Sequence, residues 1–288
     1  MSRRRWLAAI YGIALVVSTI VRIANPHSEP LVGKQLLKLS SGVRIAYYDS
    51  GAGSAQQVLL LVHGSPGSSD VVRGLAELMR DEYRVIAPDL PGFGASTHDL
   101  PDYSFRAHAT YLAELLDRLH LRRVHAAGFS MGGGVVLSLL DVAPQHVCSL
   151  DMISAIGVQE HELTGSYWAN HALHGVQLAL LWGLKYGAPH FGALDGEGLN
   201  VEYARNFFDS DQRPLRQVIA SYRGPMLIVH GKNDHNIPLA AALEHHRLAP
   251  QSQLVLFDED HFMIFQKPQL VVGPVKEFLL GIRNSCGE

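Results

Sequence analysis

Hydrophobic and polar positions follow two alternating rhythms after residue 30. Short, continuous apolar runs, typical of strands buried on both faces, alternate with longer segments whose apolar residues recur every three or four positions, as in helices. We expect strands at 34–39, 43–49, 58–62, 84–88, 124–128, 149–154, 226–230 and 253–257. Helices are expected at 71–80, 105–119, 131–142, 239–247 and 270–280. This alternation predicts an α/β fold with a mostly parallel, eight-stranded sheet.

The alternation stops between residues 157 and 221, although the strands on either side belong to one sheet. We interpret 157–221 as a helical cap inserted after the sixth strand, and 27–156 together with 222–288 as the core. The longest cap helix is expected at 168–184. It is apolar except for a narrow stripe of polar side chains, Asn170, His171, His174 and Gln177. The helix either packs on the main domain or is a lid whose apolar face contacts substrate or a membrane.

The first 26 residues form a separate segment. Arg3, Arg4 and Arg5 precede an uncharged run from Trp6 to Val21, about 16 residues long, and a helix that crosses a bilayer needs about 20. We favour an uncleaved membrane anchor over a signal peptide, because no small-x-small cleavage site follows. The arginines would remain cytoplasmic, which predicts a catalytic domain on the other side. The alternative is a secreted or periplasmic protein whose signal has been removed.

Composition narrows the function classes. Of the 288 residues, 47% are hydrophobic and 18% are charged, and the formal net charge is −3, so a nucleic-acid partner is not expected. Two cysteines are too few for a disulfide scaffold or a zinc-type cluster. The histidine pairs lack a third metal ligand nearby; they are His171 with His174, and His245 with His246. We therefore expect neither a metal nor another cofactor.

The strongest motif is Gly128-Phe129-Ser130-Met131-Gly132, which matches G-x-S-x-G. A strand is expected before it and a helix after it, the setting in which this pattern presents a nucleophilic serine on a sharp turn. Gly128 and Gly132 keep the turn free of colliding side chains. The turn also places Ser130 at a helix N-terminus, where N–H groups favour developing negative charge. Ser130 is therefore the expected nucleophile.

A serine hydroxyl needs a base, and in this arrangement an acid and then a histidine follow the nucleophile along the chain. Asp234 comes just after the strand expected at 226–230, and His261 comes just after the strand at 253–257. Both lie at the carboxyl edge of the sheet, where ligands bind in open α/β sheets. We expect Asp234 to orient His261.

Two other carboxylates compete for the role of the acid. Asp258 and Asp260 stand so close to His261 in the sequence that the imidazole could hardly point both at one of them and at Ser130. We interpret them as solvated loop charges.

Cleavage of a carbonyl compound also needs hydrogen-bond donors for the oxyanion. One donor is expected to be the backbone N–H of Met131, the residue after the nucleophile. The second should come from the loop after strand 58–62, which reads His63-Gly64-Ser65-Pro66-Gly67. We assign the N–H of Ser65, because Pro66 has none and Gly64 sets the turn.

These motifs together resemble the α/β-hydrolases over residues 35–280. The chain is most similar to the branch of lipid and carboxylic esterases, cofactor-free haloperoxidases and meta-cleavage-product hydrolases. The matching segments are residues 63–67, 89–96, 128–133, 231–234 and 260–262. Related epoxide hydrolases and haloalkane dehalogenases carry an aspartate nucleophile, whereas this chain has Ser130. Proline iminopeptidases usually show a second glycine and a tryptophan where this chain has Ser65 and Met131.

The expected activity is hydrolysis of carboxylic esters, including lipid-like acyl esters, through an acyl-enzyme. The substrate is expected to be a small, apolar ester. Two alternatives remain open at this point. One is C–C bond hydrolysis of the meta-cleavage-product type with the same residues, and the other is a ligand-binding protein on this fold with little turnover.

Overall fold

The computed structural model describes residues 2–25, 30–51, 57–195, 199 and 201–283. Its eight strands form one sheet in the order β1-β2-β4-β3-β5-β6-β7-β8. Pairing is antiparallel between β1 and β2 and between β2 and β4, and parallel elsewhere. The strands are β1 (Gln35–Lys38), β2 (Arg44–Asp49), β3 (Val58–Val62), β4 (Arg84–Pro88), β5 (Val124–Phe129), β6 (Val147–Ile153), β7 (Met226–Gly231) and β8 (Gln253–Phe257). The predicted fold class is confirmed.

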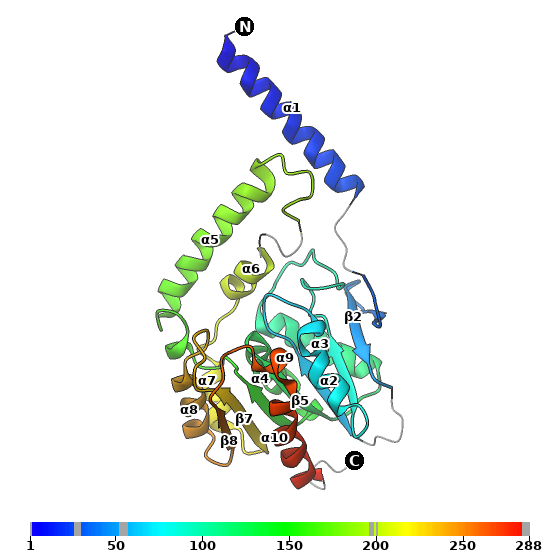
Figure 1. Ribbon diagram of the computed structural model, residues 1–288, viewed down its shortest axis with the longest axis vertical. Helices are drawn as coiled ribbons and strands as arrows, with labels where there is room; N and C mark the ends of the chain where they lie inside the picture. The colour runs from blue at the N-terminus through cyan, green and yellow to red at the C-terminus, as the bar shows by residue number, and fades with distance from the viewer. Residues whose placement is uncertain (1, 26–29, 52–56, 196–198, 200, 284–288) are drawn as a thin grey trace.

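Helices cover both faces of the sheet (Figure 1). Those between or after the strands are α2 (Arg73–Met79), α3 (Phe105–Arg118), α4 (Met131–Val142), α7 (Leu215–Ser221), α8 (Leu239–Leu248), α9 (Met263–Gln266) and α10 (Pro268–Gly281). In the described part of the chain, short 3₁₀ helices are η1 (Ser69–Val72), η2 (Pro144–His146) and η3 (Gln159–His161). The one-turn helix α9 was not predicted from the sequence, because four residues are too few to show a helical period.

The apolar interior is divided by the sheet into two clusters. Side chains of α3, α4, α7 and α8 pack on one face, and side chains of α2, α9 and α10 pack on the other. Central strands such as β5 and β6 are buried along their whole length, which explains their continuous apolar sequences. This packing holds the carboxyl ends of the parallel strands in fixed positions.

Between β6 and β7 the chain forms η3, α5 (Tyr167–Gly187), α6 (Val201–Asp209) and α7. Helices α5 and α6 pack on each other through Leu178, Val201 and Ala204. Helix α7 instead contributes Leu215 and Ile219 to the main core. The cap boundaries at 157 and 221 stay a prediction.

Helix α5 has an unusual orientation for an amphipathic helix. Its polar stripe is turned toward the protein: Asn170 and His174 are only 3% and 2% exposed. The apolar side chains of Leu173, Val176 and Leu180 are exposed instead. A helix on a water-soluble surface normally buries its apolar face.

The N-terminal helix α1 (Arg3–Ala24) is long and apolar enough to cross a membrane, by length and composition. It projects from the rest of the chain, as Figure 1 shows. Ser18 is its one buried residue among those described. Among the described residues, the hydrogen bonds between α1 and the rest of the protein go to the C-terminal end of α5 and to the segment that follows it.

Candidate active site

Ser130 occupies the turn between β5 and α4. Its backbone has φ 53° and ψ −120°, a conformation that a side chain other than glycine rarely adopts. The flanking glycines make the turn possible. A Cβ on Gly128 would lie 2.4 Å from the carbonyl oxygen of Gly132, and a Cβ on Gly132 would lie 2.4 Å from that of Val62. The strained turn lifts the Ser130 side chain out at the carboxyl edge of the sheet.

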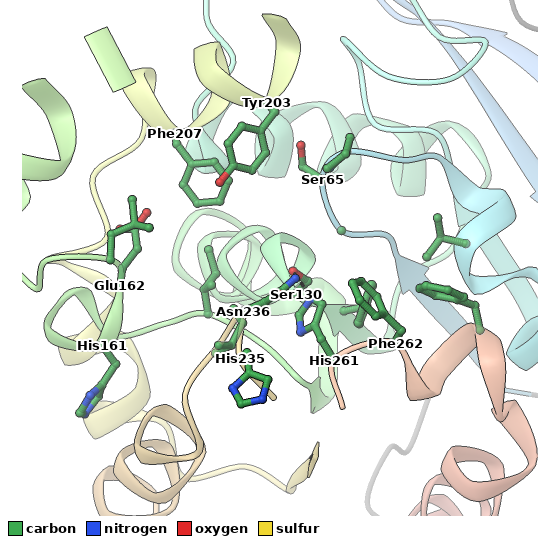
Figure 2. A pocket seen from close by; sticks show the side chains of 18 residues that line it. Ser65, Ser130, His161, Glu162, Tyr203, Phe207, His235, Asn236, His261 and Phe262 are labelled. Atoms are coloured by element: carbon green, nitrogen blue, oxygen red, sulfur yellow. Dashed lines mark hydrogen bonds between the residues drawn. The ribbon is translucent and has the colours of Figure 1, made fainter. Parts of the chain in front are cut away.

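The structure joins the three predicted catalytic side chains in one hydrogen-bonded chain. His261 Nε2 lies 3.0 Å from Ser130 Oγ, and His261 Nδ1 lies 2.7 Å from Asp234 Oδ2. Asp234 follows β7 and His261 follows β8, so parallel pairing of these strands brings their loops together. In Figure 2 the imidazole of His261 lies beside Ser130. This geometry lets Nε2 accept the hydroxyl proton while the carboxylate holds Nδ1–H.

Asp234 is fixed by its own loop as well as by the histidine. Its Oδ1 accepts hydrogen bonds from the N–H groups of Asn236 and Ile237, at 2.9 and 2.8 Å. Burial disfavours the charge, but the hydrogen bonds from His261 and Ile237 outweigh it and lower the pKa of Asp234. The carboxylate therefore stays ionised at neutral pH and stabilises an imidazolium on His261.

The two rival carboxylates lie elsewhere. Asp258 is exposed and pairs with Lys232 at 2.8 Å. Asp260 accepts a hydrogen bond from the N–H of Phe262 at 2.8 Å. Neither has a hydrogen bond to His261 in the part of the chain that the structure describes.

The two predicted oxyanion donors lie on either side of Ser130. Met131 begins α4 directly after the serine, and Ser65 lines the same pocket as Ser130. Among the described residues, neither backbone N–H has an acceptor in the protein. Both are therefore available to a ligand oxygen. The Ser65 hydroxyl is buried and likewise has no partner among these residues.

The hydrogen bonds that hold the Ser65 loop in place were not predicted from the sequence. His63 Nε2 accepts the N–H of Leu90 at 2.9 Å, so its other ring nitrogen carries the proton and donates to Gly64 O at 2.6 Å. Burial lowers the pKa of His63, which keeps the ring neutral in this role. His63 belongs to the motif at residues 63–67, but only the tertiary structure shows its hydrogen-bond partners.

A buried ion pair supports the segment that follows the loop. Asp89 accepts the N–H and the hydroxyl of Ser69 at 2.8 and 2.6 Å, and Lys34 Nζ lies 3.0 Å from its Oδ2. Lys34 and Asp89 are far apart in sequence, and no local signal predicted that they pair.

The pocket above Ser130 has a volume of about 580 Å³ and a mostly apolar lining. The cap contributes Glu162, Tyr203 and Phe207, which Figure 2 shows across the pocket from Ser130. Glu162 accepts hydrogen bonds from Gln159 and Gln212 at 3.1 and 2.5 Å. Burial raises the pKa of Glu162 to about 7. These cap residues carried no recognisable motif.

The histidine pairs considered as metal ligands pack on aromatic rings or lie in separate surroundings. His171 stacks on Phe208 and His174 on Phe207, with ring centroids 4.2 and 5.3 Å apart. His246 Nδ1 lies 2.8 Å from Ser252 Oγ. Across the described ranges, no group of three candidate ligands converges.

Comparisons with known proteins agree with this architecture. Residues 57–180 match the family model of the α/β-hydrolase fold. The chain is 29% identical to a 2-hydroxy-6-oxo-2,4-heptadienoate hydrolase from Pseudomonas putida, covering 89% of this chain and 99% of the relative.

Two solved structures are similar to the chain over most of its length. A thermophilic esterase from Thermogutta terrifontis has a TM-score of 0.71 at 21% identity, over 88% of this chain and 100% of that one. A membrane phospholipase A has a TM-score of 0.68 at 21% identity, over 98% of this chain and 100% of that one. The chain is therefore an α/β-hydrolase in fold.

Proposed function

We propose that the protein is a serine hydrolase that cleaves carboxylic esters through an acyl-enzyme. The observation that carries this proposal is the hydrogen-bonded chain from Ser130 through His261 to Asp234 at the base of an apolar pocket. In this mechanism Ser130 Oγ attacks the ester carbonyl carbon and its proton passes to His261 Nε2. The C–O bond then breaks, and the imidazolium returns the proton to the departing alcohol.

The tetrahedral intermediates place a negative charge on the former carbonyl oxygen. The free N–H groups of Ser65 and Met131 support its stabilisation. In the second half of the cycle, water takes the place of the alcohol and His261 deprotonates it. This attack releases the acid and restores Ser130.

The apolar lining supports an acyl ester with a hydrocarbon part, such as a lipid. Phe207 and Tyr203 from the cap and Phe262 from the core surround the space above Ser130. Pockets of this kind bind mainly by apolar contact, and a few polar groups set the orientation. The similarity to a membrane phospholipase A in fold is in keeping with such a substrate.

The relative from Pseudomonas putida supports one competing proposal. Its name describes hydrolysis of an oxo-dienoate. Such a substrate corresponds to the C–C hydrolysis of meta-cleavage-product type that the motif resemblance left open. The same Ser130 and His261 would serve both reactions. The ester proposal is favoured by the aromatic part of the pocket lining, whereas His161, His235 and Asn236 in the same lining are the polar partners that the carboxylate of an oxo-dienoate would need.

A substrate panel combined with one variant tests the activity. We expect wild-type protein to hydrolyse p-nitrophenyl esters of graded chain length and to react with a fluorophosphonate probe. Ser130→Ala should remove both properties, with a loss of about a thousandfold or more in kcat. Turnover of an oxo-dienoate but of no ester would favour C–C hydrolysis. Ligand binding without any turnover would favour a binding protein.

We further propose that α1 anchors the enzyme in a membrane with the catalytic domain outside the cytoplasm. Arg3, Arg4 and Arg5 flank the apolar helix on its N-terminal side, which favours a cytoplasmic N-terminus. Cys148 is disulfide-bonded, a state typical of oxidising compartments outside the cytoplasm.

Membrane fractionation with a carbonate wash tests attachment of the full-length chain, and protease accessibility in sealed vesicles tests its sidedness. Full-length protein in the soluble fraction with an intact N-terminus would contradict the anchor. A mature N-terminus near residue 25 would identify a cleaved signal instead.

A further inference from the structure

The exposed face of α5 carries no charged side chain over most of the helix. It consists of Ala169, Ala172, Leu173, Val176, Ala179, Leu180, Gly183 and Leu184. Val176 and Leu180 are 60% and 65% exposed. The polar residues of the same helix face α6 and Glu162, and they hydrogen-bond or stack there. A continuous apolar face of this length is rarely exposed to water on a soluble protein.

The C-terminal end of α5 and the segment after it lie along α1. The Tyr11 hydroxyl donates to the carbonyl of Gly187. Further along the helix, Ser18 Oγ accepts the N–H of Phe191 at 2.7 Å. Asp195 pairs with Arg22 through two hydrogen bonds of 2.8 and 2.6 Å.

These contacts cover about 16 Å of α1, because Tyr11 and Arg22 are eleven positions apart and a helix rises 1.5 Å per residue. Tyr11 lies within the apolar run of α1. If that run enters a bilayer, the end of α5 must enter with it.

Most backbone N–H groups of the segment have acceptors inside the protein. Polar backbone groups at membrane depth need partners inside the protein. The N–H groups of 188, 190, 191, 193, 194 and 195 all donate within the protein. The charge of Arg22 is neutralised by its ion pair with Asp195. The guanidinium also donates a hydrogen bond to the carbonyl of Lys185 at 2.8 Å.

We propose that α5 and residues 187–195 form a second membrane-contacting element, which lies in the interface of the lipid bilayer beside α1. This proposal rests on the proposed anchoring by α1. The exposed, uncharged face of α5 contacts the acyl chains, and the polar stripe faces the cap. Trp182 and Tyr186 near its C-terminal end are aromatic residues of the kind enriched at membrane interfaces.

A lipid surface fits better than a second protein molecule. The face is continuous with α1 through the contacts from Gly187 to Asp195, and α1 exposes apolar side chains along its length. A single bilayer covers both helices at once. Figure 1 shows α5 leaving the junction with α1 along the side of the domain.

Membrane contact at α5 would reach the active site through one layer of side chains. His174 on the inner face of α5 stacks on Phe207 of α6, and Phe207 lines the pocket above Ser130. The bilayer thus supports the wall of the substrate pocket.

The tryptophans of the chain make a direct test possible. The three are Trp6 on α1, and Trp168 and Trp182 on α5. Full-length Trp6→Phe protein is reconstituted into phosphatidylcholine–phosphatidylglycerol vesicles with brominated or ordinary acyl chains. We expect brominated lipid to reduce its fluorescence by about half or more, whereas iodide in the water has little effect.

A double variant, Trp168→Phe with Trp182→Phe, reports on α1 alone through Trp6. Quenching of Trp6 without quenching of the α5 tryptophans would overturn the docking of α5 and leave the anchor intact. If Trp6 is not quenched, the anchor fails and the docking proposal fails with it. Tryptophans on α5 that neither bromine nor iodide reaches would mean that protein covers the helix, which also overturns the proposal. None of these readouts depends on catalysis.

Substitutions on the exposed face provide a second measurement. In the Trp6→Phe background, Val176→Lys with Leu180→Lys should abolish most of the quenching by brominated lipid and make the fluorescence sensitive to iodide. The matched control is Leu243→Lys on α8, another exposed apolar residue, which should change neither. Unchanged bromine quenching in the lysine variant would contradict the proposal.

Discussion

Gly64 lies directly against Ser130: a Cβ atom built on Gly64 would be 2.9 Å from the Cβ of the serine. The contact arises because β3 and β5 pair in parallel, with Val62 opposite Gly128, so the loops after both strands leave the sheet together. The loop that carries Ser65 and the turn that carries the nucleophile are therefore fitted to each other. Changes in either one should be felt at the oxyanion site.

The first prediction separates the roles of the Ser65 backbone and side chain. Ser65→Ala should retain substantial esterase activity, because the proposed donor is the N–H. Ser65→Pro removes that donor and should lower kcat by about a hundredfold or more. Steady-state kinetics on one ester, with circular dichroism as a check on folding, measures both. Equal and severe losses would point to the hydroxyl, which is buried in the same pocket.

A second prediction concerns the acid. Asp234→Asn should lower kcat by roughly a thousandfold, because the amide cannot stabilise an imidazolium and can select the wrong tautomer of His261. Asp260→Asn is the matched control, since its carboxylate only caps the N–H of Phe262, and we expect less than a tenfold loss. Comparable losses in the two variants would show that the wrong acid has been assigned.

The crowding around the serine turn leads to a third prediction. A Cβ on Gly132 would meet the carbonyl oxygens of Val62 and His63 at 2.4 and 2.7 Å, and backbone cannot move aside easily. Gly132→Ala should therefore lower the free energy of unfolding by about 1–3 kcal/mol and reduce turnover. Gly273→Ala on α10 has no atom within 4 Å of the new methyl group and should leave stability unchanged or slightly raised. Urea unfolding measures the free energy of unfolding of both variants. Equal values for the two would contradict the prediction.

Glu162 gives a prediction about pH. Its pKa of about 7 in the folded protein is above the ordinary value, so the folded state binds more protons than the unfolded chain between about pH 4.5 and 7. Stability contributed by this group is therefore present at low pH and lost as the pH rises through about 7. Replacing it by glutamine should remove that part of the pH dependence, up to about 3 kcal/mol.

The measurement is the difference in free energy of unfolding between wild type and Glu162→Gln at pH 5 and pH 8. We expect the variant to gain relative to wild type at the higher pH. Glu202→Gln is the control: the pKa of Glu202 is lowered, so its contribution to the pH dependence lies below about pH 4.5, and its difference from wild type should barely vary between pH 5 and pH 8. A difference for Glu162→Gln that does not vary with pH would contradict the prediction.

Much of the core was predictable because the relevant signals are local. Strands such as β3 and β5 are buried on both faces, and this requires apolar side chains at successive positions. The serine turn needs glycines at 128 and 132 because backbone passes within van der Waals distance there. The order of Ser130, Asp234 and His261 along the chain predicted their meeting, and the structure brings them within hydrogen-bond distance.

Other features depended on contacts between distant segments. His63 was visible as a residue, but its partner Leu90 is 27 positions away. The raised pKa of Glu162 arises from its burial within the cap, which no pattern in its own neighbourhood predicted. The short helix α9 left no period in the sequence.

The amino-acid sequence by itself determined that α5 has one apolar face and one polar stripe, because spacing along a helix decides which side chains share a face. Only the tertiary structure decided that the polar stripe with Asn170 and His174 turns inward and the apolar face turns out. The spacing of hydrophobic residues shows which side chains of a helix share an apolar face. Whether that face is buried depends on which other parts of the chain pack against the helix. Here α6 and Glu162 supply polar and aromatic partners inside, and the contacts from Tyr11 to Arg22 set α5 beside the N-terminal helix.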